Sequence, residues 1–96
     1  MYSIDTIKER ITPIAKDYGV KRVYLFGSYA NNTANDESDV DLLIEKGVPL
    51  SLVMLSGMLQ DAKEALGVSV DLITTDGIEP DFQKQISASE ILLYEA

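Results

Sequence analysis

Three short apolar runs constrain the fold of this chain more than any other feature. They read KRVYLFG (21–27), VDLLIE (40–45) and VSVDLITT (68–75), and each is rich in β-branched or aromatic residues, as strands are. A helix-length segment precedes the first run, and a second one separates the other two. This order predicts an α+β fold in which helices pack on a small mixed sheet of three to four strands.

The helical segments show apolar residues at steps of three and four. The first predicted helix covers residues 4–18, with Pro13 as a local irregularity and Gly19 as its stop. The second begins near its cap, Ser51, and ends at Gly67.

The C-terminal part of the sequence predicts one further helix and leaves two structures open for the closing segment. Pro80 is expected to open a last helix with Phe82 and Ile86 on its buried side. The closing ILLYEA fits either a helix end or a short strand.

Composition narrows the possible functions. Ninety-six residues without a linker predict a single domain, residues 1–96, and a net charge of −8 opposes binding to nucleic acid or to an anionic membrane. Cysteine and histidine are absent, so hard cations held by carboxylates are the plausible metals. With no signal peptide or membrane span in the sequence, we expect a cytoplasmic location.

Asp39 and Asp41 form the most informative pair of residues. In a strand they would share one face with side chains less than ~7 Å apart, which is unfavourable unless a cation lies between them. Asp71 opens a strand that is expected to neighbour this one, and it could bring a third carboxylate to the same edge.

Gly27 and Ser28 follow the first strand and are expected to open a short polar turn or helix. Glycine permits close backbone approach, while the serine hydroxyl and nearby N–H groups can hold phosphate oxygens. A phosphate cradle beside metal-binding carboxylates is typical of phosphoryl or nucleotidyl transfer.

These motifs also resemble a known family. FGSYA (26–30), SDVDL (38–42) and VDL (70–72) are similar to the G-S-x-A, S-D-x-D-L and later lone-Asp pattern of the minimal nucleotidyltransferases, in the DNA polymerase β-like superfamily. The resemblance covers nearly the whole chain. The family often continues with Arg-Gly, whereas this chain has Asn31-Asn32, so a cation that could contact phosphate or a partner is missing.

The resemblance implies a nucleotidyltransferase fold that uses Mg²⁺, as two ions, and ATP. It assigns Asp39 and Asp41 to the metals, Asp71 to a metal or to activation of the acceptor hydroxyl, and Gly27 and Ser28 to the triphosphate. It further implies an antitoxin that pairs with a HEPN-type ribonuclease toxin and transfers AMP to a toxin tyrosine.

Two alternative functions do not fit these motifs, and a third remains open. A haloacid-dehalogenase-type phosphatase places its apolar strand before the D-x-D pair, whereas here that run follows the pair. A calcium loop of the EF-hand type fails on ligand spacing. A catalytically silent antitoxin that masks its partner by contact alone remains open, and the candidate contact regions are residues 52–66 and 91–94.

Overall fold

The computed structural model describes residues 2–77, 80–81, 84 and 90–96. The elements are α1 (Ile4–Tyr18), β1 (Arg22–Phe26), α2 (Gly27–Ala30), β2 (Val40–Glu45), α3 (Leu52–Leu66), β3 (Val70–Thr74), the 3₁₀ helix η1 (Thr75–Gly77) and β4 (Ile91–Glu95). In the described part of the chain, no helix is long and apolar enough to cross a membrane.

The strands form one four-stranded mixed sheet in the order β3-β2-β1-β4. β2 and β3 are parallel, and β1 is antiparallel to both β2 and β4. The predicted α+β fold is therefore confirmed, and the closing segment is a strand rather than a helix end. Pro80 and Asp81 are helical as predicted, whereas Phe82 and Ile86 lie outside the described residues.

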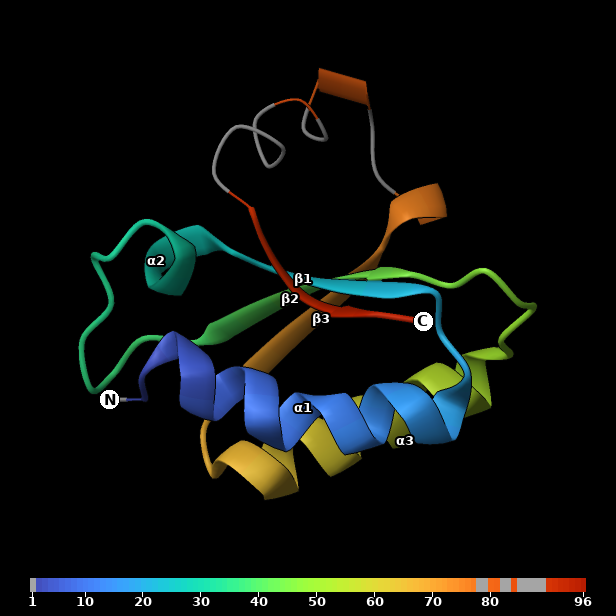
Figure 1. Ribbon diagram of the computed structural model, residues 1–96, viewed down its shortest axis with the longest axis horizontal. Helices are drawn as coiled ribbons and strands as arrows, with labels where there is room; N and C mark the ends of the chain where they lie inside the picture. Colours follow the sequence, from blue (N-terminus) through green and yellow to red (C-terminus); the bar gives the residue numbers. More distant parts are fainter. Residues whose placement is uncertain (1, 78–79, 82–83, 85–89) are drawn as a thin grey trace.

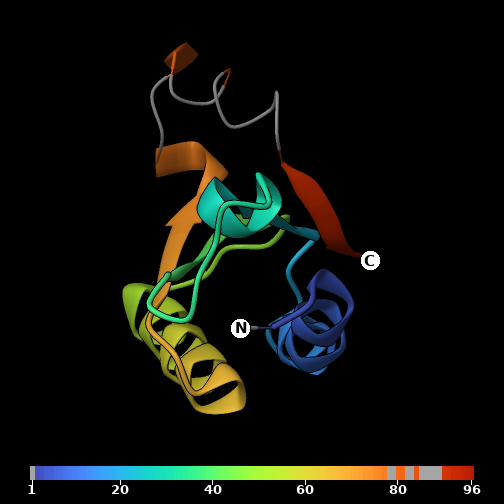
Figure 2. The ribbon, with the colours of Figure 1, turned by 90° about the vertical axis from the view of Figure 1, so that its left-hand side faces the viewer.

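Both long helices cover the same face of the sheet, as Figures 1 and 2 show. Their buried side chains meet those of the strands in one core, to which each fully buried aliphatic side chain contributes ~1.5 to 3 kcal/mol. The core comprises Ile7, Ile11 and Ala15 of α1, Met58, Ala62 and Leu66 of α3, Val23, Leu25, Val40, Leu42, Ile44, Val70 and Leu93 of the strands, and Val20 and Tyr29.

The ends of the two helices follow the predicted signals. The hydroxyl groups of Ser3 and Ser51 accept hydrogen bonds from backbone N–H groups in the first turns, and Gly19 and Gly67 end the helices in the left-handed conformation. Pro13 lies inside α1 on its exposed side without ending the helix.

Polar contacts also hold α1 against α3. The hydroxyl of Tyr18 donates to Asp61 Oδ2 at 2.8 Å, and Arg10 Nη1 donates to the carbonyl of Ala65 at 3.1 Å. The Arg10 guanidinium also lies 4.7 Å from the ring centre of Tyr2. The helix pair therefore acts as one layer under the sheet.

Strand direction decides which residues meet at the edge of the sheet. Because β1 runs opposite to β2 and β3, the end of β1 lies beside the starts of the other two. Residues just after β1 and early in β2 and β3 are thus gathered at one edge, although they are far apart in the sequence.

Candidate active site

Asp41 and Asp71 lie side by side on neighbouring strands. The parallel register of β2 and β3 pairs these two residues directly, and the antiparallel register of β1 pairs Asp41 with Phe26. Val40 and Leu42 point into the core, toward α1 and α3. Because side chains alternate along a strand, Asp41 points to the opposite face of the sheet. Asp41 is half-buried and Asp71 is exposed.

The pKa of Asp41 reflects the electrostatic interaction between the two carboxyl groups. Burial, a side-chain hydrogen bond with Asp71 and the negative charges of Asp71 and Asp39 together raise the pKa of Asp41 from 3.8 to about 6. Each of these causes disfavours the ionised form. Asp41 thus keeps its proton at a pH at which isolated aspartates are ionised, and the pair forms a site where positive charge is stabilised.

Asp39 occupies a different position from the one its spacing predicts. It lies one residue before β2 rather than in the strand, and its side chain is exposed. Its charge acts on Asp41, yet within the described residues no three acidic side chains form a group that could hold a metal. The structure brings Asp41 and Asp71 together, whereas Asp39 lies exposed at the rim of the site, one residue before β2.

Gly27 carries the backbone close to the Asp41 carboxylate. Its φ is +74°, a conformation that side chains disfavour, and a Cβ at this position would overlap Asp41 Oδ2. The turn from β1 into α2 therefore requires glycine both for its conformation and for space.

Ser28 follows in the first turn of α2. It is partly buried, and its carbonyl accepts a hydrogen bond from the Thr33 N–H at 2.9 Å, which ties the following loop to α2. Its hydroxyl has no hydrogen-bond partner among the described residues, and so it is free to bind a ligand.

Sequence reasoning assigned no role to Ser38, which the structure places in the turn before Asp39. Its hydroxyl accepts from the Asn35 N–H at 2.8 Å, while Asn35 Oδ1 accepts from the Glu37 N–H at 2.8 Å. These bonds order the approach to Asp39. The signal was present in the sequence, since Asn and Ser favour turns closed by side-chain hydrogen bonds.

The loop after α2 also accounts for one departure from the family pattern. Asn32 has a φ of 59°, in the left-handed region that glycine adopts most readily and asparagine tolerates best among other residues. Asn32 can therefore replace glycine without changing the turn, whereas Asn31 supplies no positive charge.

The donor set fits a hard divalent cation. Asp41 and Asp71 offer only carboxylate oxygens, which Mg²⁺ prefers, and the raised pKa of Asp41 marks a position where a cation would relieve repulsion. The Ser28 hydroxyl belongs to the turn that packs against Asp41. A phosphate-bearing ligand and its metal could therefore be held at the same edge.

The close approach of Gly27 predicts a large steric effect. Gly19→Ala, at φ +70° with nothing within 4 Å, should lower the free energy of unfolding by about 1 to 2 kcal/mol through conformation alone. Gly27→Ala should lower it further, because its methyl group also displaces Asp41. Urea unfolding of both variants measures the difference. In an Asp41→Ala background the excess should vanish, and an excess that persists there would contradict the steric explanation.

The raised pKa of Asp41 predicts a pH-dependent stability in the absence of divalent metal. The folded state binds the Asp41 proton more tightly than the unfolded state, so this stabilisation is present below pH 3.8 and is lost as pH rises through about 6. The melting temperature of Asp41→Asn relative to the unmodified protein should therefore rise from about pH 4 to about pH 7. The loop variant Glu37→Gln is the matched control, and a flat Asp41→Asn curve would contradict the assignment.

Comparison with known proteins identifies the family of this fold. The sequence profile of the nucleotidyltransferase domain matches residues 5–94. A proposed protein adenylyltransferase of Methanocaldococcus jannaschii is 40% identical over 84 residues, which cover 88% of this chain and 90% of that protein. A solved structure of a proposed minimal nucleotidyltransferase has a TM-score of 0.82 at 26% identity, covering 95% of this chain and 96% of that one.

Two solved complexes share the fold at lower identity. A toxin-antitoxin with AMP-PNP has a TM-score of 0.81 at 23% identity, with 93% of this chain and 73% of that chain covered. The complex of a tri-AMPylated Shewanella oneidensis HEPN toxin with an MNT antitoxin has a TM-score of 0.74 at 21% identity, with 94% and 71% covered. The fold and enzyme class predicted from the motifs are confirmed: the chain belongs to the nucleotidyltransferase domain family.

Proposed function

We propose that this protein is a Mg²⁺-dependent adenylyltransferase that acts as an antitoxin. In the proposed reaction AMP passes from ATP to a hydroxyl group, that of a tyrosine, on a HEPN-type ribonuclease toxin. The observation that carries the proposal is the pair Asp41 and Asp71 beside the Gly27-Ser28 turn. A relative named as a proposed protein adenylyltransferase and a neighbour bound to an AMPylated toxin support it.

Asp39, Asp41 and Asp71 are the proposed ligands of two Mg²⁺ ions. The bound metal would neutralise charge on the triphosphate. Asp41 must be deprotonated to serve as a ligand, and a cation beside it would lower its raised pKa. Asp39, exposed at the rim, would complete the set by turning its side chain toward the pair.

Asp71 has a second possible role in the same reaction. The acceptor hydroxyl must lose its proton as its oxygen bonds to the α-phosphorus and pyrophosphate leaves. An exposed carboxylate at the sheet edge could accept that proton from an incoming side chain. Asp71 would then orient and activate the acceptor, while Gly27 and Ser28 hold the triphosphate.

The surface of the chain supports a protein as the acceptor. A net charge of −8 repels polyanions. Leu52 and Val53 at the start of α3 are 80% and 81% exposed, as in surfaces that contact another protein. A partner that brings its own binding surface would supply the positioning that the small chain lacks.

Removal of the metal ligands tests the proposal. The double variant Asp39→Asn with Asp41→Asn should abolish transfer of label from α-labelled ATP to the co-purified toxin, because the triphosphate charge is no longer neutralised. EDTA should have the same effect on the unmodified protein. The melting temperature should be unchanged or slightly higher, because like charges are removed. Glu37→Gln, which removes a nearby loop carboxylate, should retain transfer.

The same assay separates catalysis from simple masking. Full transfer by the double variant would refute the assignment of the carboxylates. A toxin that is inhibited by the unmodified protein but never carries AMP would instead favour the catalytically silent antitoxin.

Ser28→Ala tests the proposed triphosphate contact. Loss of one hydrogen bond to a charged group should weaken nucleotide handling by about 1.5 to 3 kcal/mol in kcat/KM for ATP. The fold should be unaffected, because the hydroxyl has no partner among the described residues. Unchanged kinetics would leave the triphosphate to backbone N–H groups alone.

A further inference from the structure

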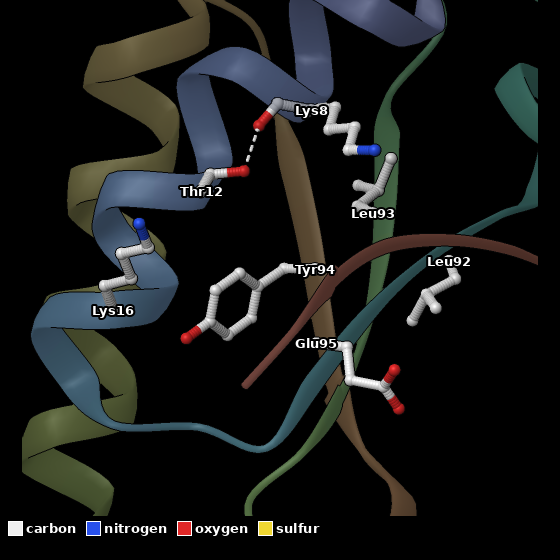
Figure 3. Close-up of a pocket in the computed structure, with 7 residues that line it drawn as sticks. All are labelled: Lys8, Thr12, Lys16, Leu92, Leu93, Tyr94 and Glu95. Atoms are coloured by element: carbon white, nitrogen blue, oxygen red, sulfur yellow. Dashed lines mark hydrogen bonds between the residues drawn. The ribbon is translucent and has the colours of Figure 1, made fainter.

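A hollow lies between α1 and β4, on the helix-covered face of the sheet. It has a volume of about 370 Å³ and is lined by Lys8, Thr12 and Lys16 of α1 and by residues 92–95 of β4 (Figure 3). We call it the α1–β4 hollow. Asp41 is on the other face of the sheet, so the hollow is separate from the candidate active site.

The hollow concentrates positive charge on an acidic protein. Lys8 and Lys16 are exposed and have no carboxylate partner among the described residues. Three other cations are engaged within the chain: Arg10 with Tyr2, Arg22 with Glu45 and Glu95, and Lys46 with Asp76. Glu95, which also lines the hollow, is paired with Arg22, a cation that it shares with Glu45. An acidic ligand would find two lysines here that have no carboxylate partner in the described residues.

The floor of the hollow is apolar and one side is open backbone. Figure 3 shows the Tyr94 ring directed toward α1, between the levels of Thr12 and Lys16, while Glu95 points away. β4 is the last strand of the sheet, and its outer edge pairs with no strand in the described part of the chain. Such an edge can accept an added strand.

The spacing of the two lysines matches an extended chain. Eight residues of helix separate Lys8 from Lys16 by ~12 Å along the axis. On one face of a strand, residues four apart are ~13 Å apart. Carboxylates at these two positions of a strand that lies along β4 could each reach one lysine, with the chain between them passing over the Tyr94 ring.

We propose that the α1–β4 hollow docks an extended acidic segment of a partner protein, which adds to the edge of β4 and pairs two carboxylates with Lys8 and Lys16. This inference rests on the proposed function for the existence of a protein partner. It does not depend on AMP transfer, because the hollow lies on the opposite face from Asp41. The proposal therefore assigns binding of the partner to the α1–β4 hollow and modification of the partner to the candidate active site.

Peptide binding tests the docking site directly. The probe is a fluorescein-labelled ten-residue peptide with two glutamates four residues apart, a leucine midway, and serine and threonine elsewhere. Anisotropy with the full chain at low salt should show saturable binding. A peptide of the same composition with the glutamates three residues apart points them to opposite faces and should bind at least about threefold more weakly.

Matched variants assign the contact to the hollow. Lys8→Gln with Lys16→Gln should weaken peptide binding about tenfold through the loss of two ion pairs. Lys21→Gln with Lys63→Gln changes the net charge equally outside the hollow and should stay within about twofold. Thermal melting confirms that all variants are folded.

Several results would overturn the proposal. These are equal weakening by the two double variants, equal binding of the two peptides, or no saturation up to about 1 mM peptide. Displacement of the peptide by tripolyphosphate at lower concentration would assign the hollow to a phosphate chain. Self-association that the Lys8 and Lys16 changes abolish would assign it to a second copy. None of these readouts involves nucleotide transfer. A negative peptide-binding result would therefore leave the transferase proposal unchanged, and a failed transfer assay would leave the docking proposal unchanged.

Discussion

The parallel register of β2 and β3, which places Asp41 directly beside Asp71, is the constraint on which the rest of the candidate site depends. Two carboxyl groups held side by side repel each other, and this is one cause of the raised pKa of Asp41. The arrangement persists because Val40 and Leu42, on either side of Asp41, are buried in the core. A slip of one residue would put the carboxylate in the core and the apolar side chains outside, so packing enforces the register.

The remaining elements bring the Gly27-Ser28 turn to this pair. β1 runs antiparallel to β2 and ends beside Asp41, and Gly27 lets the chain turn there without a side chain in the way. Both long helices lie on the opposite face of the sheet, as Figure 2 makes clear, so the face that carries the carboxylates is not covered by α1 or α3. The helix-covered core therefore lies on one face of the sheet, and the candidate active site lies on the other.

This division also organises the charges of the molecule. The acidic edge carries the proposed metal site, where negative charge is needed, and it would repel an incoming polyanion. Lys8 and Lys16 of the α1–β4 hollow, which have no carboxylate partner in the described residues, lie on the helix side of the sheet, separated by the strands from the carboxylates. A partner could be steered to the hollow electrostatically while ATP and metal occupy the other face.

The sequence by itself determined the local elements and the chemistry. Periodicity and capping residues predicted both long helices to within a residue, and the motifs around Gly27, Asp41 and Asp71 predicted the family and its enzyme class, because these signals are local. Only the tertiary structure decided that residues 91–95 form a strand, since the pairing partner, β1, is distant in the sequence. It also decided why position 27 excludes a side chain, that Asp39 stays at the rim, and that a hollow lies between α1 and β4. Each of these depends on which distant segments meet, and that is set by strand register and core packing, not by local pattern.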